Sequence, residues 1–118
     1  MKRDKLAAMQ ATGGKKNDES KPRYDLIPPD AIEAVAHVFR IGAQKYGERD
    51  WEKGLKWGRV FRAMMSHAWA FWRGETHDKE DGQEHLASVA WCALVLLSYD
   101  RHCREWDDRP WGYGEKNK

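Results

Sequence analysis

The chain has 118 residues, of which 41% are hydrophobic and 34% are charged. This length suits one compact domain and is too short for two. The 21 Lys and Arg residues against 19 Asp and Glu give a formal charge of +2, which excludes a strongly basic coat for nucleic acid, so we expect no duplex nucleic acid as a partner. The longest largely apolar run, Leu86 to Leu97, falls short of the ~20 residues that a membrane span needs, so we expect no membrane partner.

Cysteine usage and the N-terminal sequence bear on the compartment. Cys92 and Cys103 have neither a metal-binding spacing nor the pattern of a disulfide framework. The basic start of the chain is not followed by the apolar stretch of a secretory signal. We therefore expect a protein of a reducing cytoplasm.

Hydropathy divides the chain into three parts. Residues 1–20 are too polar to repay the entropy of ordering, and we expect a flexible arm. Residues 21–106 form the predicted domain, and residues 107–118 are an irregular tail. The domain begins with Lys21–Pro29, where the prolines predict extended backbone.

Three segments have the apolar spacing of helices. The first runs over 30–46, with Asp30 and Glu33 as a capping box and Gly47 as a stop. The second covers about 59–73 and ends before Gly74. The third starts near Asp81, continues to about 104, and is apolar nearly all round. No segment alternates with period two for long enough to predict a strand.

These patterns predict an all-α fold, a helical bundle whose last two helices form a central antiparallel hairpin. Seven tryptophans in so short a chain favour an oligomer interface or a pocket that stacks planar rings, although most could simply fill a small core. A helix apolar on all sides needs more cover than two neighbours provide. We expect a homo-oligomer, in which the third helix completes the bundle with its symmetry mate.

Acidic residues and histidines gather at the turn of the predicted hairpin. Antiparallel pairing brings the end of one helix and the start of the next together, and carboxylates there suit Mg²⁺, whereas imidazoles shift the preference toward Mn²⁺ or Zn²⁺. Simple helix capping is an alternative role for Asp81 and Glu84. We expect Mg²⁺ or Mn²⁺ as cofactor, with Glu75, Asp78 and Glu80 as ligands and His67, Glu75 and His85 as catalytic residues.

A second group is basic and aromatic and lies mainly in the segments that flank the first helix. Arginine forks match phosphate oxygens, and Tyr and Trp faces can stack a base. A solvated face with scattered aromatics is the alternative. We expect a small-molecule nucleotide as ligand, bound by Lys21, Arg23, Lys45, Tyr46, Trp51 and Arg62.

Three motifs make the chain similar to a known family. They are Lys21–Pro28, the run Gly42–Gly47 followed by Trp51, and the stretch from His67 through Gly74–Gly82 to Ala87. Together they resemble the phage-encoded dATP/dGTP diphosphohydrolase N-terminal domain. The resemblance covers about 21–101 and implies a mostly helical protein of phage origin, active in the host cytoplasm, with purine deoxynucleotides as ligands.

The family name implies hydrolysis of a triphosphate to a monophosphate and pyrophosphate. The related all-α MazG-type pyrophosphatases hold Mg²⁺ with Glu-Glu-x-x-Glu on one helix and Glu-x-x-Asp on the next. This chain departs from that pattern, with Ala63–His67 at the first motif and Ser88 in place of the last Asp. We therefore expect a metal-dependent nucleoside triphosphate pyrophosphohydrolase acting on dGTP or dATP. Two alternatives are a non-catalytic protein that sequesters nucleotide immune signals in phage anti-defence, and a plain interaction protein.

Overall fold

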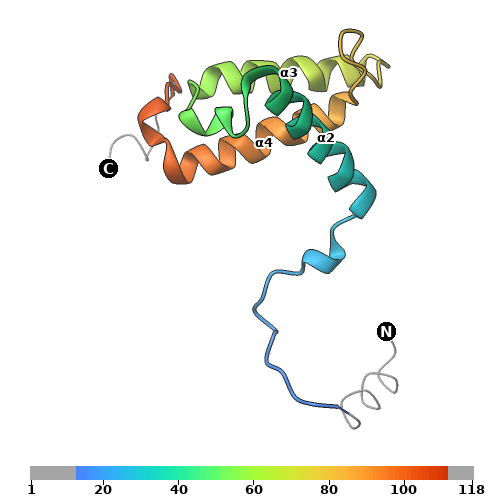
Figure 1. Ribbon diagram of the computed structural model, residues 1–118. Coiled ribbons are helices and arrows are strands. Elements are labelled where there is room, and N and C mark those ends of the chain that lie inside the picture. The colour runs from blue at the N-terminus through green and yellow to red at the C-terminus, as the bar shows by residue number, and fades with distance from the viewer. Residues whose placement is uncertain (1–12, 112–118) are drawn as a thin grey trace.

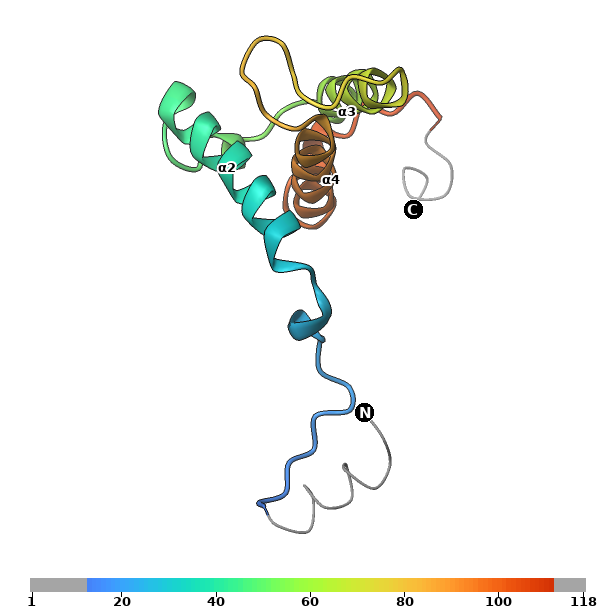
Figure 2. The ribbon, with the colours of Figure 1, turned by 90° about the vertical axis from the view of Figure 1, so that its right-hand side faces the viewer.

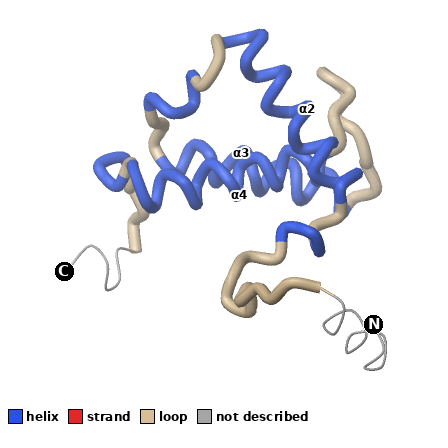
Figure 3. The backbone as a smooth tube through the Cα atoms, turned by 60° about the horizontal axis from the view of Figure 1, so that its bottom comes forward, coloured by secondary structure: helices blue, strands red, loops and turns tan. Residues whose placement is uncertain are grey.

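We describe residues 13–111 of a computed structural model of the chain. The expected flexible arm and irregular tail are thus described only over 13–20 and 107–111. Three helices form the body, namely α2 (Pro29–Tyr46), α3 (Trp57–Trp72) and α4 (His85–His102). Short 3-10 helices accompany them: η1 (Tyr24–Leu26), η2 (Asp50–Lys53) and η3 (Arg104–Trp106). Helices and loops make up the whole described chain without a strand (Figure 3), so the predicted all-α fold with an antiparallel α3–α4 hairpin is confirmed.

The capping arrangement at the start of helix α2 differs from the predicted one. Its N-cap is Pro28, which makes no side-chain capping hydrogen bond. The Asp30 carboxylate accepts instead from the N–H of the adjacent Ala31, at 2.9 Å. The predicted capping box of Asp30 with Glu33 is therefore wrong, because Pro29 already supplies helical backbone geometry one residue earlier. Gly47 ends the helix with a φ of +104°, as expected.

Helix α4 begins four residues later than the Asp81 start that the sequence suggested. The Asp81 carboxylate accepts from the N–H of Gln83 at 2.9 Å, which is a side-chain turn rather than a helix cap. Glu84 is the N-cap residue, and no side chain caps it. The helix also ends at His102, and Cys103 then leads into η3.

Helix α3 starts at Trp57, two residues before the predicted start. Its first turn receives a cap from far along the chain, because the N–H of Gly58 donates to the Asp108 carboxylate at 2.8 Å. A carboxylate at a helix N-terminus also meets the positive end of the helix dipole. The segment after η3 is thereby tied to the start of α3.

The core lies between α3 and α4. Its buried members are Trp57, Val60, Cys92, Val95 and Tyr99. Helix α2 packs against α4 on one side of the hairpin (Figure 2) and adds Phe39, while η2 adds Trp51. The Tyr99 hydroxyl donates to the backbone oxygen of Trp51, and burial raises the pKa of Tyr99 to about 12. This contact fixes the loop after α2 against α4.

The segment before α2 leaves the helical body (Figure 1). Every residue from 13 to 33 is exposed. The stretch expected to be extended contains one helical turn, η1, next to an Arg23–Asp25 ion pair at 2.8 Å. This part of the chain therefore makes its contacts locally rather than with the core.

Candidate active site

The loop between α3 and α4 is closed by backbone hydrogen bonds at its base. The N–H of His85 donates to Thr76 at 2.9 Å, and the N–H of Asp78 donates to Gln83 at 2.8 Å. Gly74, with a φ of +102°, turns the chain away from α3. The loop is thus folded back on itself, and Glu75 and Asp78 are held beside the ends of both helices.

Two imidazoles meet inside this hairpin end. His67 comes from the last half of α3 and His85 from the first position of α4, and their Nδ1 atoms lie 2.8 Å apart. Asp78 of the loop places its Oδ2 atom 3.8 Å from Nδ1 of His67. One ligand atom from each of the three residues lies within 4.8 Å of the others. The antiparallel hairpin therefore gathers this cluster, as expected for His67, Asp78 and His85.

Glu75 stands behind the cluster and holds His85. Its Oε1 atom lies 2.9 Å from Nε2 of His85, whose side chain is 5% exposed. The hydrogen bond from His85, helped by Lys79, lowers the pKa of the Glu75 carboxyl, and partial burial opposes the shift. An ionised carboxylate accepts only, so Nε2 of His85 carries the proton. In the neutral ring Nδ1 then presents its lone pair toward His67.

The donor set of the cluster is compatible with a divalent metal. His67 Nδ1, His85 Nδ1 and an Asp78 oxygen would hold it, and Glu75 would act as the carboxylate that orients a ligating histidine. Two imidazoles with one carboxylate favour Mn²⁺ or Zn²⁺ over Mg²⁺. Of the three ligands expected from sequence, only Asp78 belongs to the cluster. Glu75 lies behind His85, and Glu80 is exposed and offers its backbone N–H to Asp78.

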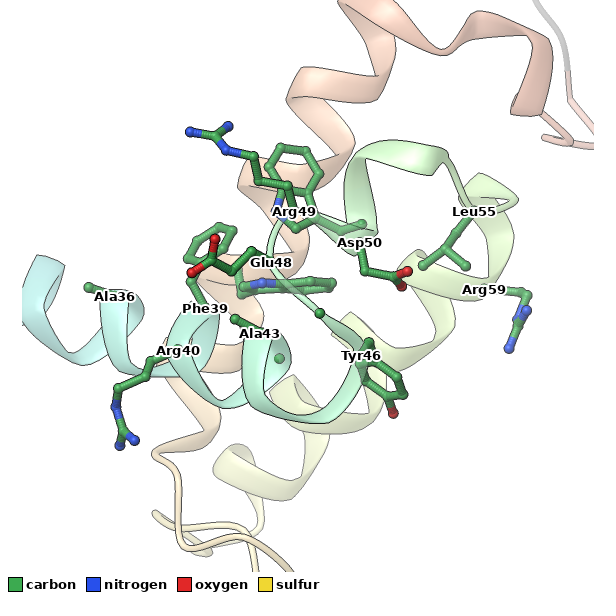
Figure 4. A pocket seen from close by; sticks show the side chains of 14 residues that line it. Ala36, Phe39, Arg40, Ala43, Tyr46, Glu48, Arg49, Asp50, Leu55 and Arg59 are labelled. Carbon is green, nitrogen blue, oxygen red and sulfur yellow. The ribbon is translucent and has the colours of Figure 1, made fainter.

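A cavity of about 760 Å³ opens between α2, η2 and α4 (Figure 4). Its apolar wall comes from Phe39, Trp51 and Trp91, and the Phe39 ring lies 6.1 Å from Trp51 and 5.9 Å from Trp91. Its rim carries three arginines, Arg40, Arg49 and Arg59, together with Glu48 and Asp50. Arg49 is paired with Glu52 at 2.6 Å. An aromatic wall with arginines on its rim suits a ligand that has both a planar ring and phosphate groups.

Only some of the expected nucleotide-binding residues reach this cavity. Tyr46 and Trp51 line it. Lys21 and Arg23 lie on the exposed segment before α2, and Arg23 is paired with Asp25. Lys45 and Arg62 do not line the cavity either. Lys45 is exposed on α2, and Arg62 lies on α3 next to Phe61 and Met65.

The binding set expected from sequence leaves out several residues that line the cavity, among them Phe39, Arg40, Arg59 and Trp91. A usable pattern existed for α2, where Ala36, Arg40 and Ala43 follow helical spacing beside Phe39. No such pattern marked Trp91, because α4 carries no charged residue from 86 to 99 that would distinguish one of its faces.

Helix α4 links the cavity to the histidine cluster, although no residue of the cluster lines the cavity. Trp91 of the cavity follows His85 by six residues on α4, a rise of roughly 9 Å along the axis. Arg40 lines the main cavity and also a smaller one of about 300 Å³ beside the loop residues His77 and Gln83. An arginine therefore stands between the aromatic wall and the hairpin end.

Comparison with known proteins decides the family. The family model described as dATP/dGTP diphosphohydrolase, N-terminal, matches residues 11–109. The chain belongs to this family. The match confirms the resemblance seen in the three sequence motifs, and it spans both the histidine cluster and the aromatic cavity.

One relative within the comparison carries the family's name. A protein of Salmonella phage PMBT28 named dATP/dGTP diphosphohydrolase is 36% identical to this chain over 98 residues. The alignment covers 83% of this chain and 33% of the relative, so the family domain described here spans about a third of that protein. No solved structure matches the chain. Within residues 13–111, no helix is long and apolar enough to cross a bilayer.

Proposed function

We propose that this domain is a phage-encoded, metal-dependent pyrophosphohydrolase of purine deoxynucleoside triphosphates, with dGTP and dATP as substrates. The observation that carries the proposal is the cluster of His67, Asp78 and His85 with Glu75 behind it. The name of the phage relative supports the substrate class. In this reaction the oxygen of water forms a bond to the α-phosphorus, and the bond from that phosphorus to the α–β bridging oxygen breaks. Pyrophosphate leaves, and a proton is released to solvent.

The metal centre is assigned to His67, Asp78 and His85. When bound, a divalent ion supplies Lewis-acid stabilisation of negative charge on the phosphate oxygens. Glu75 fixes the ring orientation of His85, and the buried position of His85 limits its motion. His67 is more exposed than His85, so we assign to it the orientation of the attacking water through its outer ring nitrogen, Nε2.

The base is assigned to the aromatic cavity and the phosphates to the arginines on its rim. Trp51, Trp91 and Phe39 offer ring faces or edges to a purine. Arg40 lies on the side of the cavity that leads toward the hairpin loop, where it can neutralise charge on the phosphates. Lys21 and Arg23 remain proposed phosphate ligands only if the segment before α2 closes over the bound nucleotide.

Turnover separates this proposal from nucleotide sequestration. Purified protein is incubated with dGTP or dATP and Mn²⁺, and monophosphate and pyrophosphate are quantified. We expect both products in equal amounts, and a loss of at least 100-fold for His67→Ala and Asp78→Asn. His102→Ala and Glu33→Gln, on exposed positions outside the site, are the matched controls and should keep the wild-type rate.

Two results would contradict the proposal. Equal rates for the cluster variants and their controls would show that the cluster takes no part in the reaction. Tight binding with intact nucleotide recovered, and no products at any metal concentration, would instead favour the sequestering role. That role is the second candidate because the cluster holds a single carboxylate next to two imidazoles, fewer acids than the related pyrophosphatases use.

A further inference from the structure

The α3–α4 hairpin has a second side, which α2 does not cover. Figure 2 shows α2 packed beside α4, and α2 makes its main contacts with that helix. At one end of the other side, residues 104–111 line a groove together with Phe61 and Leu97. Large apolar side chains are exposed along both helices. We call them the hairpin face, and they are Phe61, Met65, Trp69 and Trp72 of α3 with Leu86, Leu94 and Leu97 of α4.

The spacing of these residues makes two stripes on antiparallel helices. On α3 the intervals are four, four and three residues, and on α4 the residues from Leu86 to Leu97 span three turns. The stripes meet at one end, where Phe61 and Leu97 line the same groove of about 840 Å³, together with charged residues such as Asp100 and Arg104. They therefore form one continuous surface rather than scattered exposed residues.

The lack of charge on α4 makes this exposure unusual. The 14 residues from 86 to 99 contain no Asp, Glu, Lys or Arg, although Leu86, Leu94 and Leu97 are about half exposed. A helix that is apolar all round is normally buried on all sides. Helices α2 and α3 cover one part of its surface, so the remaining part requires another partner.

The exposed apolar area approaches what a dimer needs. Trp72 is 78% exposed, Trp69 56% and Phe61 52%. With about 200 Å² per aromatic side chain, these three alone leave roughly 370 Å² uncovered. Met65 and the leucines bring the apolar area above the 300–600 Å² of the largest patch on a typical monomer and toward the ~800 Å² per partner of a stable interface.

We propose that the hairpin face binds the same face of a second copy of this chain. The hairpin face is mainly apolar, with Arg62 of α3 and Arg73 at the end of that helix beside it. Such a surface on two antiparallel helices is complementary to itself when a two-fold axis passes through it. The result is a layer of four helices, with α3 and α4 of each copy in the contact. The aromatic cavity is lined by α2 and η2, outside the hairpin face, so it stays open in the dimer.

Sedimentation equilibrium of the full chain at micromolar concentration tests this directly. We expect a particle of twice the 13.8 kDa chain mass. Phe61→Glu and Leu97→Glu each bury a charge in the contact and should raise the dimer dissociation constant at least 100-fold. Ile32→Glu is the matched control, because Ile32 is an equally exposed apolar residue on α2 outside the face.

A second measurement needs no variant. Hydrogen–deuterium exchange of the wild-type chain, followed from low to high concentration, should show added protection over 61–72 and 86–97 and none over α2. A monomer at all concentrations would overturn the proposal. So would an oligomer that Phe61→Glu and Leu97→Glu leave intact, or one whose added protection lies on α2.

Discussion

Replacing Glu75 by Gln separates the orientation of His85 from the metal ligands themselves. The substitution keeps the size of the side chain and leaves an oxygen that can still accept from Nε2 of His85, 2.9 Å away. It removes the negative charge, and the amide can equally donate, so the ring is no longer held in one tautomer. Substitution of such a supporting carboxylate typically weakens metal binding 10–100-fold, and we expect a change of about that size.

Calorimetric titration with Mn²⁺ at neutral pH measures the effect. Glu105→Gln, on an exposed carboxylate of η3, is the control and should bind Mn²⁺ as the wild type does. Asp78→Asn removes a direct ligand and should weaken binding more than Glu75→Gln. Wild-type affinity in Glu75→Gln, or a loss equal to that of Asp78→Asn, would refute the division into ligands and a supporting residue.

Three further predictions concern stability. The hydrogen bond from His85 is the main cause that lowers the pKa of the Glu75 carboxyl. The ionised carboxylate therefore stabilises the fold fully above the ordinary pKa near 4.5. This contribution to the free energy of unfolding is lost as the pH falls through the lowered pKa. In acid titrations followed by circular dichroism, Glu75→Gln should therefore lose less stability than the wild type below pH 5. Asp108→Ala should lower the free energy of unfolding by about 1 kcal/mol in urea denaturation, because the N–H of Gly58 loses its acceptor. Val95→Ala should cost about 2–3 kcal/mol, because the side chain is fully buried in the core.

Each of these three has a contradicting outcome. Parallel acid titration curves for the wild type and Glu75→Gln would show that the lowered pKa makes no contribution to folding. An unchanged urea midpoint for Asp108→Ala would mean that the cap is not formed in solution. A cost below 0.5 kcal/mol for Val95→Ala would place this residue outside the packed core.

The fold class could be predicted because apolar periodicity depends on local spacing alone. The starts of α2 and α4 could not, since they depend on competition between turn and helix. Asp30 and Asp81 have the residue type of an N-cap, but each bonds to a backbone N–H within two residues. Asp108 performs the capping role for α3 from 50 residues away, and no local pattern records such a contact.

The candidate site, like the fold, could be predicted from the sequence only in part. Antiparallel helices must bring His67 and His85 to one end of the hairpin, and this follows from sequence. Which acid joins them depends on how the loop folds, and the backbone pairing of Asp78 with Gln83 selects Asp78 and leaves Glu80 exposed. The aromatic cavity depends on the angle at which α2 crosses α4, so Trp91 had no signature in the sequence.

The most direct test of the metal centre is a crystal of the chain with Mn²⁺ and a non-hydrolysable dGTP analogue, measured at a wavelength where manganese scatters anomalously. We expect a single strong peak bonded to His67, Asp78 and His85, with the purine in the cavity of Trp51 and Trp91. A peak held by other residues, or none beside the two imidazoles at saturating Mn²⁺, would contradict the account.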